Sequence, residues 1–211
     1  WTLAEGEPPT YALEGSIFAT GATIQWLRDG LGIIDSASEV GPLAASVADT
    51  GGVYLVPAFV GMGSPWWDPR ARGIIVGLTR GSGRAHLARA AVEAMAFQTR
   101  DVIDAVGRGG GPAITRLRVD GGASVMDLLL ELQADLLDMP VTRSAVQETT
   151  ALGAAWLAGL GEGFWSSTGE LAGLWKAETT FRPTQDRQAA EVSYGRWLAA
   201  VERSLAWEQA D

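Results

Sequence analysis

The stretch Val119-Asp120-Gly121-Gly122-Ala123-Ser124 separates a predicted strand from a predicted helix. Residues 117–119 have the composition of a short strand, and residues 127–137 that of an apolar-rich helix. Because Gly121 and Gly122 lack a Cβ atom, a flat or charged ligand can approach the main chain there, close to the free N–H groups of a helix start. Paired glycines also make ordinary strand–turn–helix connections. The stretch alone therefore leaves a structural role and a binding role open.

Strands and helices alternate on both sides of this stretch, which predicts one α/β domain rather than a helical bundle or a β-sandwich. The apolar run at 73–78 is typical of a strand buried on both faces of a sheet. Further strands are expected at 10–18, at 53–56 and, as a short edge strand, at 140–143. Helices are expected at 22–29, 36–48, 84–106, 149–160 and 185–207.

Composition limits the classes of protein to which the chain can belong. The 211 residues can bury one sizeable core, and no apolar run approaches the length needed to span a bilayer. The absence of cysteine excludes a disulfide framework and fits a cytoplasmic protein. A net charge of −9 argues against binding to nucleic acid or to an anionic membrane. The start at Trp1, without a signal segment, indicates a fragment or a processed product of a longer protein.

Candidates for catalysis are few. His86 is the only histidine, and its place at the start of the 84–106 helix favours a structural or solvent-facing role. Neither a G-x-S-x-G elbow nor a G-x-x-x-x-G-K-[ST] phosphate loop is present. Asp120, Asp127 and Glu131 cluster near the glycines without a clear acid/base spacing. The sequence therefore predicts no catalytic residue and no metal site within this chain.

Signals for binding are stronger than those for catalysis. A second helix begins at a glycine, Gly21, and could converge with the one after Gly121 and Gly122 on a single ligand. The purine and ribose of a nucleotide suit such a site, because they stack on backbone and accept a few polar contacts.

Several segments of the sequence form a recognisable set. They are Tyr11–Gly15, Gly21–Asp29, Val56–Phe59, Trp67–Gly73, Ala96–Val102, Thr149–Ala155 and Gly163–Trp165. A longer pattern runs from Gly73 through Gly77-Leu78, a seven-residue spacer, His86-Leu87 and residues 90–93. Together these segments resemble the C-terminal domain of the glycerol kinases, which are FGGY carbohydrate kinases, and the longer pattern matches the second signature of that family.

The resemblance implies an RNase H-like fold of the actin and sugar-kinase type, with a mixed sheet flanked by helices. It implies that residues 1–211 form the nucleotide-binding domain and that the catalytic, glycerol-binding N-terminal domain lies outside the chain. ATP with Mg²⁺ is the implied cofactor. The implied nucleotide contacts are Gly21, Gln25, Gly121, Gly122 and Ala123, together with Met126 at a position where the family usually has Asn. An Asn amide can hydrogen-bond a base or ribose, whereas Met offers only an apolar contact.

The implied reaction is transfer of the γ-phosphoryl group of ATP to glycerol, giving glycerol 3-phosphate, in a homo-oligomeric, cytoplasmic full-length protein. ATP or ADP and glycerol are then the partners, without nucleic acid or membrane. The chain alone is expected to be inactive and to self-associate through exposed apolar surface. Two alternatives stay open. One is the equivalent domain of another FGGY kinase such as xylulokinase, and the other is a non-catalytic module that has lost nucleotide binding.

Overall fold

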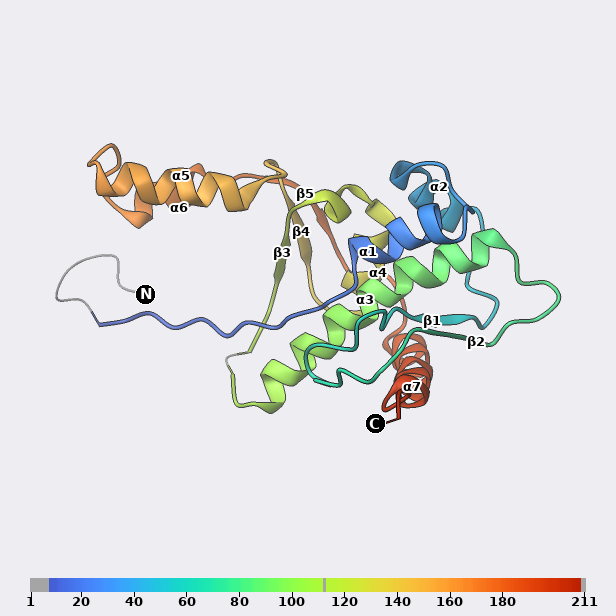
Figure 1. Ribbon diagram of the computed structural model, residues 1–211. Helices are drawn as coiled ribbons and strands as arrows, with labels where there is room; N and C mark the ends of the chain where they lie inside the picture. Colours follow the sequence, from blue (N-terminus) through green and yellow to red (C-terminus); the bar gives the residue numbers. More distant parts are fainter. Residues whose placement is uncertain (1–7, 112, 210–211) are drawn as a thin grey trace.

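A computed structural model describes residues 8–111 and 113–209 of the chain (Figure 1). Within them, α4 (Asp127–Leu137) spans the residues predicted for it. Other expected helices are present with shifted ends: α1 (Gly21–Gln25) continuing into a π-helix (Trp26–Gly30), α3 (Arg84–Arg108), α5 (Thr149–Gly161) and α7 (Arg187–Ser204). The helix expected at 36–48 is shorter, a 3-10 turn at Ala37–Glu39 followed by α2 (Val40–Ala45). Helix α6 (Thr168–Leu174) and strand β5 (Ala177–Phe181) were not predicted.

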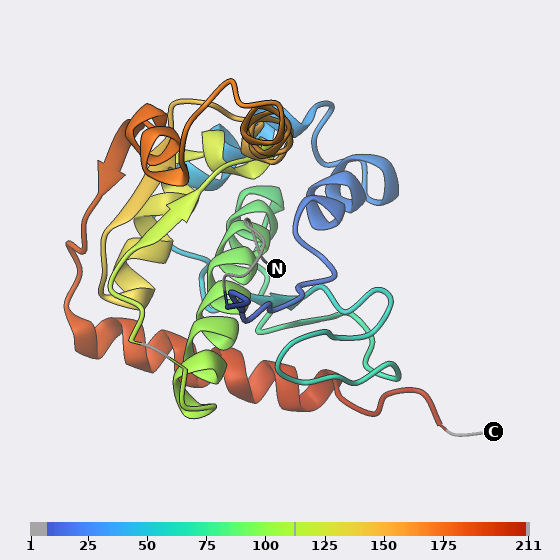
Figure 2. The same ribbon diagram turned by 90° about the vertical axis from the view of Figure 1, so that its left-hand side faces the viewer.

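Helix α3 runs through the middle of the molecule and organises the core (Figures 1 and 2). It packs against α2, α4 and strand β1. Small side chains at Ala88, Ala91, Ala94 and Ala96 are buried and let these neighbours approach closely. The ring of Phe97 stacks on the fully buried Trp197 of α7, with 5.3 Å between ring centroids.

A three-stranded mixed sheet lies beside α4. Strand β4 (Val141–Ser144) pairs in parallel with β3 (Leu117–Val119) and antiparallel with β5, so the strand order is β3-β4-β5. The prediction that residues 140–143 form an edge strand was wrong, because β5 covers the side of β4 that the sequence seemed to leave free. Val141 is fully buried between Leu117 and Phe181, its partners on the two neighbouring strands.

Two further strand predictions needed correction. Strand β2 (Ile74–Val76) pairs with β1 (Tyr54–Val56) in a two-stranded antiparallel ribbon, and its residues are only half-buried, not covered on both faces. Residues 10–18 run extended, without belonging to a strand. Their backbone finds no neighbouring strand in the described part of the chain; Ser16 alone makes a reciprocal pair of hydrogen bonds, with Ser64.

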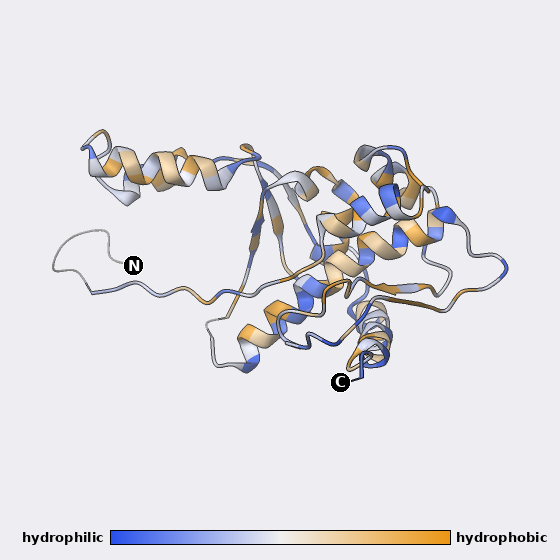
Figure 3. Cartoon of the chain, in the orientation of Figure 1, coloured by the Kyte–Doolittle hydropathy of each residue, from blue (hydrophilic) through white to orange (hydrophobic). Residues whose placement is uncertain are grey.

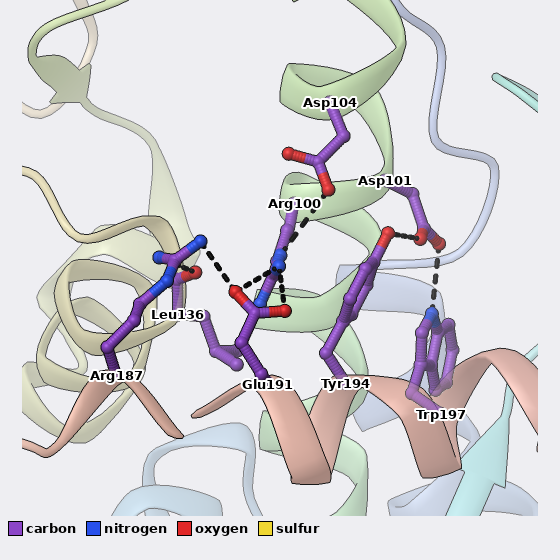
Figure 4. Close-up of polar contacts among 8 residues, drawn as sticks. All are labelled: Arg100, Asp101, Asp104, Leu136, Arg187, Glu191, Tyr194 and Trp197. Carbon is purple, nitrogen blue, oxygen red and sulfur yellow. Dashed lines mark hydrogen bonds and ion pairs between the residues drawn. The ribbon is translucent and has the colours of Figure 1, made fainter. Parts of the chain in front are cut away.

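A polar network fastens α7 to α3 (Figure 4). The buried carboxylate of Asp101 accepts hydrogen bonds from the Tyr194 hydroxyl at 2.6 Å and from the indole N–H groups of Trp197 at 3.0 Å and Trp66 at 3.3 Å. Burial raises the pKa of Asp101, and these hydrogen bonds oppose the rise. The neighbouring Arg100 donates to both carboxylate oxygens of Glu191, at 2.8 and 2.7 Å.

We expect the Arg100–Glu191 pair to make stability pH-dependent. The hydrogen bond from Arg100 lowers the pKa of Glu191 below its ordinary value of 4.5. The stabilisation that the charged Glu191 side chain contributes is therefore present above pH 4.5 and is lost as the pH falls through the folded-state pKa. Because Glu191 is 44% exposed, Glu191→Gln should lower the free energy of unfolding at pH 7 by only about 1 kcal/mol. Urea denaturation at pH 7 and pH 3 measures this, and an equal loss at both values would contradict the prediction.

Helices α5 and α6 project from one end of the sheet as an arm, defined here as residues 149–174 (Figure 1). Helix α5 contains no buried residue. Hydrophobic residues nevertheless recur along it (Figure 3). Its first turn is attached to the body, since the Asp120 carboxylate accepts hydrogen bonds from both the backbone N–H and the hydroxyl of Thr149.

Candidate functional site

A cavity of about 650 Å³ opens between α1 and the turn that follows β3. All six residues predicted to contact a nucleotide line it: Gly21, Gln25, Gly121, Gly122, Ala123 and Met126. The side chains of Ile24, Val40 and Met95 also line it and belong to the hydrophobic core. The structure therefore brings together two segments that lie a hundred residues apart in the sequence.

The first wall is α1 and the residues just before it. The Gln98 side chain of α3 donates a hydrogen bond to the carbonyl oxygen of Ala19 at 3.2 Å, and the Thr23 hydroxyl donates to the same oxygen at 3.3 Å. These bonds fix the chain where α1 begins. A Cβ atom on Gly21 would meet no other atom within 4 Å, so the backbone of this wall is open to a ligand.

The second wall is the turn after β3. Gly121 has φ = 81° and ψ = 178°, a conformation open essentially to glycine only. Its N–H donates to the carbonyl of Gln147 at 2.8 Å, and its own carbonyl accepts from the Ser124 hydroxyl at 2.8 Å. The chain then forms a 3-10 turn, Gly122–Val125, before α4 begins at Asp127. The helix predicted over 127–137 is confirmed, and the 3-10 turn between it and the paired glycines was not predicted.

The backbone of the 3-10 turn is suited to receive a ligand. A Cβ atom on Gly121 or Gly122 would meet nothing within 4 Å. Arg143 of β4 donates to the Ser124 carbonyl at 3.0 Å and to the Asp127 carboxylate at 2.7 Å, which holds the turn from behind. The turn is thus open to a ligand on the cavity side and is held in place by Arg143 on the sheet side.

Helix α3 connects the two walls through consecutive residues. Gln98 holds the entry to α1, and the Thr99 hydroxyl accepts a hydrogen bond at 3.0 Å from the Gln133 side chain of α4. Met95, one turn earlier on the same helix, lines the cavity. The separation of the walls is therefore set by the packing of α1 and α4 on α3.

Met126 closes one side of the cavity. It occupies the N-cap position of α4, where its side chain makes no capping hydrogen bond. Its Cγ lies 3.2 Å from the place that a Cβ atom on Gly41 of α2 would take. Met126 also lines a smaller pocket of about 360 Å³ on its other side, so its thioether chain separates the two spaces.

Sequence reasoning missed four polar residues of the cavity: Thr20, Arg28, Ser38 and Asp120. Arg28 lies three residues after Gln25, and this helical spacing was the available signal. The bidentate hydrogen bond from Arg28, at 2.7 and 2.8 Å, lowers the pKa of the adjacent Asp29. Asp120 is engaged with Thr149 at the root of α5 and is not a free acid or base.

Three predictions were negative: His86 has a structural or solvent-facing role and not a catalytic one, the chain holds no metal site, and no segment spans a membrane. The Nδ1 atom of His86 accepts the Gly83 N–H at 3.1 Å and so caps α3. Within residues 8–111 and 113–209, three or more His, Asp or Glu side chains nowhere gather into a group that could hold a metal ion. No described helix is both long enough and apolar enough to cross a bilayer.

The fold and the two-walled cavity define an α/β domain of the kind found in sugar kinases. Residues 1–162 match the C-terminal domain of the FGGY family of carbohydrate kinases. The chain belongs to this family.

Two sequence relatives within this family are both glycerol kinases. The chain is 57% identical to a glycerol kinase of Dechloromonas aromatica over 95% of its own length and 52% identical to one of Saccharolobus islandicus over 98%. It spans 40% and 41% of these two relatives. A crystal structure of Plasmodium falciparum glycerol kinase with ADP matches all of this chain and 41% of that one, with a TM-score of 0.87 and 32% identity. A xylulose kinase from Rhodospirillum rubrum matches 89% of this chain and 38% of its own, with a TM-score of 0.74 and 27% identity.

Proposed function

We propose that this chain is the nucleotide-binding domain of an ATP-dependent glycerol kinase and that its cavity holds the adenosine part of ATP. The observation that carries the proposal is the convergence of the six predicted contact residues on one cavity. Its volume of about 650 Å³ lies in the range of small-molecule sites. The open backbone at Gly21, Gly121 and Gly122 fits a flat ring system that lies against the main chain.

In this proposal the chain's own residues bind and orient, and they do not transfer protons. Gln25 and Arg28 supply polar side chains on the α1 wall, and Gly122 and Ala123 supply backbone on the other. ATP is the substrate that supplies the γ-phosphoryl group for the terminal hydroxyl of glycerol. In kinase sites Mg²⁺ is held by one or two carboxylates together with substrate phosphates and water.

The remaining elements of the activity belong to the part of the relatives that this chain does not span. The proposal places the general base and the glycerol contacts in that part, together with any contact that makes the protein a homo-oligomer. A cytoplasmic protein, without nucleic acid or membrane as partner, fits the charge of −9 and the absence of cysteine. Glycerol is favoured over xylulose as substrate because the relatives at 52–57% identity are glycerol kinases.

Met126→Asn should improve nucleotide binding and stability together. Asparagine at an N-cap accepts a backbone N–H of the first helical turn, which stabilises by about 1 kcal/mol, and its amide would also face the cavity. We expect a several-fold lower Kd for ADP in calorimetric titration and a higher urea midpoint.

Two further variants make this experiment decisive for the proposed function. Met126→Ala should lose the contact with α2 near Gly41 without gaining either hydrogen bond, and so should not bind ADP more tightly. A chain that binds ADP in none of the three forms would support the non-catalytic alternative. Equal affinities for ADP in the methionine and asparagine forms would show that this side of the cavity does not touch the nucleotide.

A further inference from the structure

A second cavity, of about 570 Å³, lies where α3, α4, α7 and the turn before β1 meet. Its volume is in the range of small-molecule sites. It shares no lining residue with the cavity assigned to the nucleotide. The proposed kinase function therefore makes no use of it.

Apolar side chains form part of the lining of this second cavity. Phe97, Leu132, Leu136 and Ala190 all line it, and each is less than one-tenth exposed. The ring of Tyr54 lies 6.0 Å from that of Phe97. These side chains come from α3, α4, α7 and β1, so the packing of those elements forms the cavity before any ligand arrives.

Buried polar groups at the cavity lack partners within the part of the chain that the structure describes. Thr50 is 6% exposed, and its hydroxyl makes no hydrogen bond to a described residue. Asp135 is 8% exposed; its Oδ1 accepts from the backbone N–H groups of Thr184 and Gln185 at 2.6 and 3.1 Å, whereas its Oδ2 accepts from no described residue. Neither unpaired atom is fully enclosed by protein. Because buried polar groups normally have hydrogen-bond partners, these two are suited to receive a ligand.

The charged side chains at the cavity have both signs. Arg89 donates from Nε to one carboxylate oxygen of Glu93 at 2.8 Å, and the two side chains are only 11% and 13% exposed. Burial raises the pKa of Glu93 against the effect of Arg89, and the charge of Asp49 adds to the rise. Arg196 of α7 is exposed and forms no ion pair or hydrogen bond with a described residue. The lining thus offers carboxylate oxygens and a guanidinium group that are all free to pair with a ligand.

A ligand with charges of both signs fits this lining. The three carboxylates and two guanidinium groups at the cavity nearly balance, so a purely anionic or purely cationic ligand would meet groups of its own sign. We propose that the cavity binds a small zwitterion of the apolar α-amino acid class. Its ammonium group would donate to the free oxygens of Asp135 and Glu93, and its carboxylate would pair with Arg196, in charge-assisted hydrogen bonds. Its side chain would lie against the apolar part of the lining. A failure of ADP to bind the other cavity would leave this proposal intact.

The test uses L-leucine and two analogues that each lack one of its charged groups, 3-methylbutylamine and 4-methylpentanoate. The Kd of each compound is measured from saturable chemical-shift changes of the backbone amides of Thr50, Gly51 and Gly52, which line the cavity. L-leucine should bind, and each analogue should bind about tenfold more weakly or worse, because each loses the hydrogen bonds of one charged group.

Arg196→Gln tests the carboxylate end of the ligand. It should raise the Kd of L-leucine about tenfold and leave that of 3-methylbutylamine unchanged, because the amine has no carboxylate to pair with Arg196. Since Arg196 is exposed and unpaired among the described residues, its replacement should leave the fold intact. Arg203→Gln is the matched control. Arg203 is an exposed arginine of the same helix that does not line the cavity, and its replacement should change neither Kd.

Three results would overturn the proposal. The first is the absence of a saturable shift at these amides with L-leucine. The second is an analogue that binds as tightly as L-leucine, since the amine would then identify a site for organic cations and 4-methylpentanoate a site for anions. The third is an equal loss of L-leucine affinity in Arg196→Gln and Arg203→Gln, which would show an effect of net charge and not a pairing with Arg196.

Discussion

Gly21→Trp should weaken the binding of ADP at least tenfold while leaving the fold intact. A side chain added at Gly21 meets no protein atom at its Cβ position and starts from the rim of the cavity, so an indole there would occupy the space that the proposal assigns to adenosine. We expect at least a tenfold rise in Kd, which corresponds to about 1.4 kcal/mol. The Kd is measured by calorimetric titration in the Met126→Asn background, because the tighter binding expected there lets a larger rise in Kd be followed.

The matched control for this variant is Gly195→Trp. Gly195 lies on α7, has the same open surroundings and is not among the residues that line the cavity. Its replacement should leave ADP binding unchanged. An equal loss of affinity in both variants would point to a general effect of an added tryptophan. Unchanged binding in Gly21→Trp would place the nucleotide elsewhere.

Asp101→Ala should lower the free energy of unfolding by about 3 kcal/mol. The carboxylate is 1% exposed and accepts hydrogen bonds from Tyr194 and Trp197 of α7. Its removal leaves two buried donors without an acceptor, and each unsatisfied group costs about 1–3 kcal/mol. The alanine change also removes the cost of burying the charged carboxylate, which is seen in the raised pKa of Asp101. This gain offsets part of the loss. Urea denaturation at neutral pH measures the difference.

Two control variants test whether the loss of stability comes from the hydrogen bonds to Asp101. Asp101→Asn keeps one carbonyl acceptor at the same place and should cost less than the alanine change. Asp104→Ala removes a carboxylate one turn away on α3 that is 35% exposed and is linked to Arg100 only at 3.4 Å, so about 1 kcal/mol or less is expected. A loss at Asp101 no larger than at Asp104 would show that the two hydrogen bonds from Tyr194 and Trp197 do not fasten α7.

The local patterns in the sequence identified most elements, because local chemistry decides them. Helices α3 and α4 follow their apolar periodicity, and the paired glycines mark the turn that Gly121 makes at positive φ. The long-range pairing of strands was not readable in the same way. Strand β5, Ala-Glu-Thr-Thr-Phe, is mostly exposed and lacks an apolar alternation, yet its place beside β4 turns the expected edge strand into the central one.

The cavity residues were predicted by resemblance, and the structure brings all of them together. Their meeting depends on features that no local pattern contains, namely the hydrogen bonds of Gln98 with the entry to α1 and of Thr99 with Gln133 of α4. Residues 10–18 illustrate the opposite case. Their composition favours a strand, but a strand needs a neighbouring strand with which to form a hydrogen-bonded ladder, and none lies beside these residues in the described chain. Val192 and Trp207, two apolar residues of the helix expected over 185–207, are 57% and 64% exposed.

The attachment of α5 at the rim of the cavity links the arm to the proposed nucleotide site. Asp120 holds Thr149 at the first turn of α5, and the next residue, Gly121, is bonded to Gln147 just before that helix. We expect order in the arm and order at Gly121 to favour one another, because a ligand that arrives at an already ordered wall loses less conformational entropy. By reciprocity, a ligand that orders Gly121 would favour order in the arm by the same free energy.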